Sequence, residues 1–157
     1  IAMVRVGSGP LQNTLYDLHR SLGVLILVLM LIRLFWRLYK PAPPLVEGLP
    51  PWQAAAARAT HWLLYAALLA MPLLGWAGTS AFGAPITVFG LFEWPAMLGK
   101  DQQLAGVLLG IHTWLGFAAT ALVILHVGAA LHHHFVRKDD TLRRMMPGYR
   151  AGAGSRS

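Results

Sequence analysis

The chain has 157 residues, of which 56% are hydrophobic and only 12% charged, and its mean hydropathy of +0.53 excludes an ordinary soluble domain. It contains no cysteine, which excludes disulfides, thiolate metal sites and covalent haem attachment, so histidine is the main candidate for strong metal ligation. The net charge of +7 does not indicate a nucleic-acid partner, because most Arg and Lys residues flank apolar runs, as they do in membrane proteins.

Three apolar segments predict three transmembrane helices, at residues 15–39, 52–78 and 102–136. Each segment is long enough, since a hydrocarbon core about 30 Å thick needs roughly 20 residues of helix. Pro72 lies inside the second segment and predicts a kink, which neighbouring helices can tolerate in a membrane. We therefore expect an all-α integral membrane helical bundle that occupies residues 1–148.

The remaining segments are predicted to be connections and a tail. Residues 40–52 are rich in proline and cannot continue a helix. Residues 79–101 include the apolar and aromatic run "ITVFGLFEWPAML", which suits a loop lying at the membrane interface. The low-complexity residues 149–157 are expected to form a disordered basic tail.

Positive charge is distributed unevenly between the two sides of the predicted bundle. The side formed by the first connection and the tail carries most of it and should face the cytoplasm, which places the C-terminus there and the first residue outside. One further helix upstream would place the N-terminus inside, so we expect that the chain lacks its original first span. The cytoplasmic side carries Arg37, Lys40, Arg58, Arg137, Lys138, Arg143, Arg144 and Arg150, and the outer side Arg5, Arg20 and Lys100.

Two histidines in the third predicted helix face the same way. His112 and His126 are 14 residues apart, which corresponds to about 1400° of rotation, roughly 40° short of four turns, and to about 21 Å along the axis. An imidazole in lipid is costly, so each should face the bundle interior and have a partner. Haem is a suitable partner, because it is flat and apolar and takes axial imidazoles.

His19 is the expected partner of His112, because both lie near the outer end of their helices. Gly23 and Gly116 follow them at the i+4 position, on the same helix face, where a porphyrin needs small neighbours. The competing interpretation of a buried histidine in a membrane helix is a hydrogen bond between helices. We assign that structural role to His61, which has the bulky Tyr65 at the i+4 position.

Other polar residues are weaker candidates for function. Arg20 is predicted to attract anions or to pair with an outer haem propionate, and Lys100 adds positive charge on the same side. Arg33 points to the inner level of the bundle, where it either pairs with a propionate or extends to the interface. His132, His133 and His134 span about 300° of the helix surface, so they cannot all line one site. We expect interfacial solvation for them, with His132 and His133 as alternatives for a quinone pocket or proton transfer.

Three segments resemble the bacterial cytochrome b561 family, and most closely its superoxide oxidase branch, over about residues 11–148. They are "LHRSLGVLILVLMLIRLFWRLYKPAPPL", "HWLLYAALLAMPLLGW" and "IHTWLGFAATALVILHVGAALHHHFVRKDDTLRRMMPG". The resemblance implies a four-helix bundle with two b-type haems in the bacterial cytoplasmic (inner) membrane, three of whose helices are present here.

The resemblance also implies roles for the histidines. His19 and His112 would bind the periplasmic haem, and His126 the cytoplasmic haem opposite a histidine of the first helix. Because that helix is expected to be missing, the second haem lacks a ligand in this chain, and His61 is a candidate substitute.

Three functions are compatible with these patterns. The first is a superoxide oxidase that takes electrons from superoxide outside and reduces ubiquinone inside, as the resemblance implies. The second is a haem-bearing membrane anchor that relays electrons for a hydrogenase or dehydrogenase partner protein, since the same histidine spacing serves both. The third is a haem-free structural membrane protein.

Overall fold

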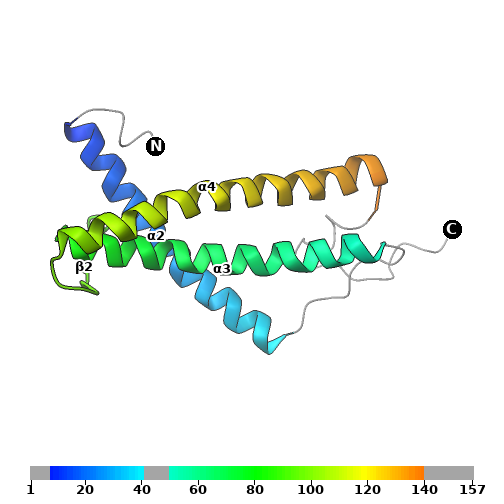
Figure 1. The fold of residues 1–157 in the computed structure, drawn as a ribbon, viewed down its shortest axis with the longest axis horizontal. Helices are drawn as coiled ribbons and strands as arrows, with labels where there is room; N and C mark the ends of the chain where they lie inside the picture. The colour runs from blue at the N-terminus through cyan, green and yellow to red at the C-terminus, as the bar shows by residue number, and fades with distance from the viewer. Residues whose placement is uncertain (1–7, 41–49, 140–157) are drawn as a thin grey trace.

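The structure is a computed structural model that describes residues 8–40 and 50–139. Three long helices dominate these ranges, namely α2 (Pro10–Tyr39), α3 (Pro51–Phe82) and α4 (Gln102–His132), as Figure 1 shows. Each is long and apolar enough to cross a membrane, so the predicted helical membrane bundle is confirmed. The predicted tail, 149–157, lies outside the described residues.

The helix ends follow from local sequence, and three of them differ from the prediction by four or five residues, one being the end of α4 at His132 instead of residue 136. α2 begins at Pro10, five residues earlier than expected, because proline is tolerated in the first turn of a helix. α3 extends to Phe82 instead of ending at residue 78, and it stops at Gly83, whose φ of 85° suits glycine. Asp101 caps α4 by accepting hydrogen bonds from two backbone N–H groups in its first turn, both at 3.0 Å.

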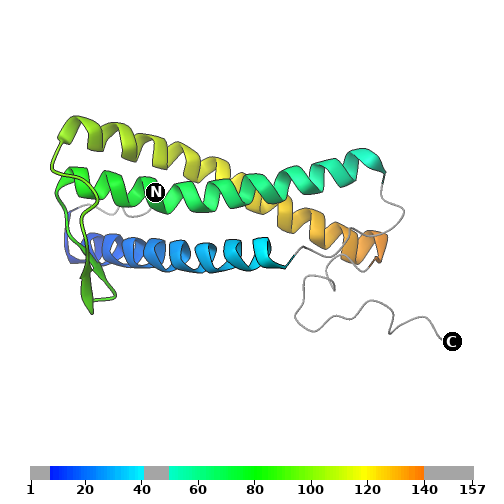
Figure 2. The ribbon, with the colours of Figure 1, turned by 90° about the horizontal axis from the view of Figure 1, so that it is seen from below.

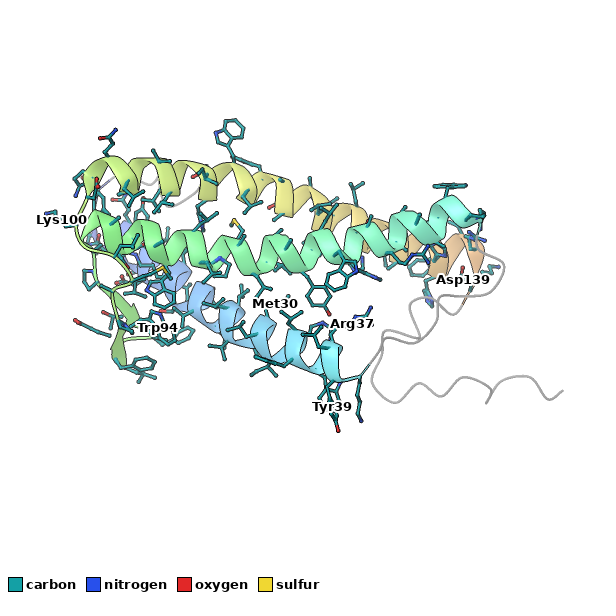
Figure 3. The ribbon with its side chains drawn as sticks, turned by 60° about the horizontal axis from the view of Figure 1, so that its bottom comes forward. Met30, Arg37, Tyr39, Trp94, Lys100 and Asp139 are labelled. Carbon is teal, nitrogen blue, oxygen red and sulfur yellow. The ribbon has the colours of Figure 1, made fainter. Side chains whose placement is uncertain are left out.

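α3 is the central helix of the bundle. It packs along α4 and against α2, and Figure 3 shows it between the other two. α2 crosses α3 at an angle, so that α2 begins on the side of α3 where α4 lies and ends on the other side (Figure 1). Large apolar side chains on all three helices are exposed, as expected for surfaces that face lipid.

A β-hairpin covers the end of the bundle where α2 begins, α3 ends and α4 begins (Figure 2). Its strands are β1 (Ile86–Val88) and β2 (Phe92–Trp94), which pair antiparallel with Ile86 opposite Trp94. The sequence predicted only an interfacial loop here, because strands of three residues give no clear alternation. We call this end of the bundle the hairpin end.

Ser21 of α2 fastens the hairpin to the helices. Its hydroxyl oxygen lies 2.7 Å from the Asp17 carbonyl and 3.2 Å from the Thr87 carbonyl, which share its one proton, and it accepts a hydrogen bond of 2.8 Å from the Phe89 N–H. Below it, one face of the hairpin packs on the helices through buried side chains. These are Val24, Ile86 and Val88, with Trp76 and Trp94 against them.

Candidate functional site

His19 of α2 and His112 of α4 face each other near the hairpin end. Their ring centroids are 5.8 Å apart and the ring planes are perpendicular, at 90°. Two imidazoles bound to opposite sides of one metal, each with a metal–nitrogen bond of about 2 Å, have centroids roughly 6 Å apart. The structure therefore brings these two predicted ligands together at the spacing of an axial pair, which we call the hairpin pair.

A hydrogen bond to the backbone of α3 orients His112. Its Nδ1 lies 2.9 Å from the carbonyl oxygen of Met71. Since a carbonyl can only accept, Nδ1 carries the proton and Nε2 keeps its lone pair. Metal-ligating histidines commonly have this arrangement, because it fixes both the tautomer and the orientation of the ring.

Gly75 of α3 makes the position of His112 possible. A Cβ atom on Gly75 would lie 3.0 Å from Cε1 and 3.2 Å from Nδ1 of His112, which is too close for an unperturbed ring. Gly75 was not predicted from the sequence, although it lies 14 residues after His61, the same separation that relates His112 to His126.

A largely apolar cavity of about 480 Å³ opens beside the hairpin pair. This volume lies in the range of cofactor and ligand sites. Gly23 lines it, and a Cβ there would meet open space, whereas Gly116 is absent from the lining and faces the methyl group of Met71. The lining includes Tyr16, His19, Arg20, Gly23, Val24, Gly75, Trp76, Ile86, Trp94 and His112.

The predicted cations Arg20 and Lys100 both lie at the hairpin end. The guanidinium of Arg20 is 3.5 Å from the Asp17 carboxylate and 3.4 Å from the Pro85 carbonyl oxygen. Arg20 also lines the cavity, whereas Lys100 is exposed at the end of the bundle, as Figure 3 shows. Arg20, paired with Asp17, is therefore the cation beside the cavity, and Lys100 adds a second positive charge at the same end of the bundle.

A second pair of imidazoles lies further along α3 and α4. His61 and His126 have ring centroids 5.4 Å apart and an interplanar angle of 72°, and we call them the distal pair. Hydrogen bonding between helices was predicted for His61, but the contact recorded for it in the described part of the chain is this ring contact with His126. The antiparallel register of α3 and α4 that places Gly75 opposite His112 also places His61 opposite His126. Knowledge of this register would have allowed the contact between His61 and His126 to be predicted.

Two cationic side chains of α2 lie on the His61 side of the distal pair. Arg33 and Arg37 are within electrostatic range of the His61 imidazole. Arg33 is exposed and Arg37 is half-buried, and Figure 3 shows Arg37 near the end of α2 away from the hairpin.

His132 and His133 lie at the end of α4 opposite the hairpin, where η1 (His133–Arg137) continues the helix as a π-helical turn. Their ring centroids are 6.1 Å apart. Nδ1 of His133 is 2.6 Å from a carboxylate oxygen of Asp139, and Asp139 is at the opposite end from Lys100 in Figure 3. Arg137 donates to the Gln53 side chain at 2.7 Å and so ties this turn to the start of α3.

The donor set suits a metal that brings its own equatorial ligands. Within residues 8–40 and 50–139, no group of three or more His, Asp or Glu side chains could hold a bare metal ion. Two opposed imidazoles instead supply the two axial positions of a flat macrocycle, as in haem. The residues of the hairpin pair and its apolar cavity therefore fit haem.

Comparison with known proteins gives one family. The family described as prokaryotic cytochrome b561 matches residues 1–148. Cytochrome b561 homolog 2 of Escherichia coli (strain K12) is 39% identical over 130 residues, which are 83% of this chain and 69% of that protein. The probable superoxide oxidase CybB of Yersinia pestis is 38% identical over 130 residues, 83% of this chain and 73% of that protein. Cytochrome b561 homolog 1 of Escherichia coli (strain K12) is 36% identical over 132 residues, 83% of this chain and 74% of that protein.

Proposed function

The chain belongs to the prokaryotic cytochrome b561 family of membrane b-type cytochromes, and from this premise we propose that it moves electrons across the bacterial inner membrane from superoxide to ubiquinone. The hairpin end faces the periplasm and the end with Asp139 faces the cytoplasm, in keeping with the positive charge near that end. One relative at 38% identity is named a probable superoxide oxidase, which supports this choice of substrate.

The observation that carries the proposal is the hairpin pair. His19 and His112 face each other at 5.8 Å beside a 480 Å³ cavity, and Nδ1 of His112 is fixed on the Met71 carbonyl. These two histidines would hold the iron of haem b, and a haem bound there would accept and release one electron at a time. Gly23 and Gly75 leave room for the macrocycle and for the His112 ring.

Positive charge at the cavity mouth serves the substrate. Superoxide is an anion, and Arg20 and Lys100 raise its local concentration at the hairpin end. Arg20 is held beside the cavity by the Pro85 carbonyl and by Asp17, whose carboxylate offsets part of its charge. Because this attraction acts over distance through solvent, added salt should weaken it.

The distal pair extends the path across the membrane. His126 is the proposed axial ligand at this level, and His61 lies opposite it at 5.4 Å, in the position of a second ligand. Arg33 and Arg37 would offset the negative charge of propionates.

Reduction of ubiquinone needs two electrons and two protons, so two superoxide ions are oxidised to dioxygen for each quinol formed. His132 and His133 lie at the end of α4 where those protons would enter. The short contact between His133 and Asp139 gives a group that can take up and release a proton.

Rapid mixing of the purified full chain with superoxide tests the proposal. In liposomes containing ubiquinone, we expect rapid reduction of the haem spectrum followed by quinol formation. A haem that superoxide leaves oxidised, together with co-purification of a large redox subunit, would favour the relay function instead. A preparation without haem would contradict both.

A further inference from the structure

Trp94 is the cavity residue whose polar group has no partner. Its indole Nε1–H is fully buried and makes no hydrogen bond, and it is the one such buried side-chain atom within residues 8–40 and 50–139. A buried donor left unpaired destabilises a protein, so native structures almost always supply an acceptor. Trp94 therefore needs an acceptor that the described part of the chain does not provide.

Trp76 is a neighbouring tryptophan with the opposite property. It lines the same cavity and its ring lies 5.6 Å from that of Trp94, in an edge-to-face arrangement. Its Nε1–H donates to the Pro95 carbonyl oxygen at 2.8 Å. Trp76 thus fixes the hairpin to α3, whereas the indole N–H of Trp94 has no acceptor among the described residues.

The surroundings of Trp94 indicate an anionic acceptor. Trp94 pairs with Ile86 across the hairpin, and the preceding residue, Pro85, accepts a hydrogen bond from Arg20. Arg20 of α2 thus contacts the backbone next to the strand position opposite Trp94, and both residues line the cavity. A cation beside an unpaired donor suits a carboxylate oxygen.

We propose that the Trp94 indole donates a hydrogen bond to a propionate carboxylate of the haem held by His19 and His112, with Arg20 as its charged neighbour. This role rests on the proposed function, because it requires haem in the cavity. The hairpin is then a positioning element that fixes the orientation of the haem in its plane, as well as a cover for the bundle end.

The test compares Trp94→Phe with Trp76→Phe in the full chain, because both changes remove an indole N–H from one cavity and keep an aromatic ring. The measurements are the rate of haem transfer to excess apomyoglobin and the haem midpoint potential. For Trp94→Phe we expect haem loss about tenfold faster, the typical effect of one hydrogen bond to a charged group, and a shifted potential. For Trp76→Phe we expect a smaller increase in the rate of haem loss, because it loosens the hairpin without removing a donor to the haem, together with a lower unfolding temperature, since it breaks the bond to Pro95.

Reconstitution with haem dimethyl ester identifies the acceptor. The ester lacks carboxylate charge, so the difference between Trp94→Phe and the parent chain should shrink towards zero. An equal difference with both haems, or equal haem loss from the two tryptophan variants, would overturn the proposal. A variant defective only in its reaction with superoxide would show that the acceptor is the substrate anion, and this too would overturn it. Failure of the proposed function can be distinguished from failure of the role of Trp94. In that case the parent chain would contain no haem, or a His112→Ala variant would keep its full haem content, and either result would appear before the tryptophan variants are compared.

Discussion

The hairpin pair and the distal pair have similar imidazole spacings but different surroundings. At the hairpin end, His112 is oriented by the Met71 carbonyl, packed against Gly75 and placed beside a cavity that the hairpin covers. For the distal pair, the ring contact between His61 and His126 is accompanied by positive charge from α2. The distance between two ligands therefore does not by itself define a metal site, because the hydrogen bonds and packing around the ligands determine how firmly they are held.

Removal of the oriented ligand should have the largest effect. We expect His112→Ala to lose the haem at the hairpin end, because His19 alone supplies one axial position. Haem content per protein, measured as the pyridine haemochrome, and the split of the reduced absorption band report the loss. A His112→Ala protein with unchanged haem content would contradict the assignment.

Replacement of His61 should affect only the distal level. We expect His61→Ala to lose the haem at the distal pair and to keep the redox transition of the haem at the hairpin pair. Redox titration monitored by absorption separates the two levels. If His61→Ala keeps every redox transition of the parent chain, then His61 is not a haem ligand, and the distal pair does not supply two axial ligands as the hairpin pair does.

A methyl group on Gly75 should weaken the hairpin site through His112. The added Cβ would be 3.0 Å from the ring, so the ring must move and its bond to Met71 must lengthen. Disturbing such a supporting contact typically lowers metal affinity by about 10- to 100-fold, which haem transfer to apomyoglobin measures. Gly110→Ala is the matched control on α4, because its Cβ would meet nothing within 4 Å. Equal haem loss in both variants would argue against packing as the cause.

Removal of the Ser21 hydroxyl, which holds the hairpin to α2, should have a smaller effect on haem binding. Ser21→Ala leaves the Phe89 N–H without its acceptor, and we expect a loss of about 1–2 kcal/mol in stability. Thermal unfolding of the purified protein would show it, with faster haem loss from the hairpin pair only. An equal change at the distal pair would mean that the hairpin does not act locally.

The smallest expected effect is electrostatic. Neutralising Arg20 and Lys100 with glutamine should slow the reaction with superoxide several-fold at low salt and should make its rate nearly independent of ionic strength. Rapid-mixing rates at increasing salt concentration test this. A salt dependence as steep as that of the parent chain would assign the steering to other residues.

The sequence allowed the membrane helices and the hairpin pair to be predicted, because both depend on the length of apolar segments and on positions within them. Hydropathy located three spans, and depth matching related His19 to His112, although their role as ligands stays a prediction. The contact between His61 and His126 depends on the register of α3 against α4, which no single-helix pattern contains. Gly75 and Trp94 were not predicted for a related reason. The role of each depends on residues of other segments that pack against it, namely His112 for Gly75 and Trp76 for Trp94.

The most direct test of the central claim is electron paramagnetic resonance of the oxidised, purified full chain. The perpendicular ring planes of His19 and His112, at 90°, predict a highly anisotropic low-spin ferric signal from a haem with two imidazole ligands. The part of that signal due to the hairpin pair should vanish in His112→Ala and persist in Gly110→Ala, while a haem at the distal pair, whose ring planes are at 72°, keeps its own signal in both variants. A purely high-spin spectrum, or an anisotropic signal that His112→Ala leaves at full intensity, would contradict the claim that the hairpin pair holds haem.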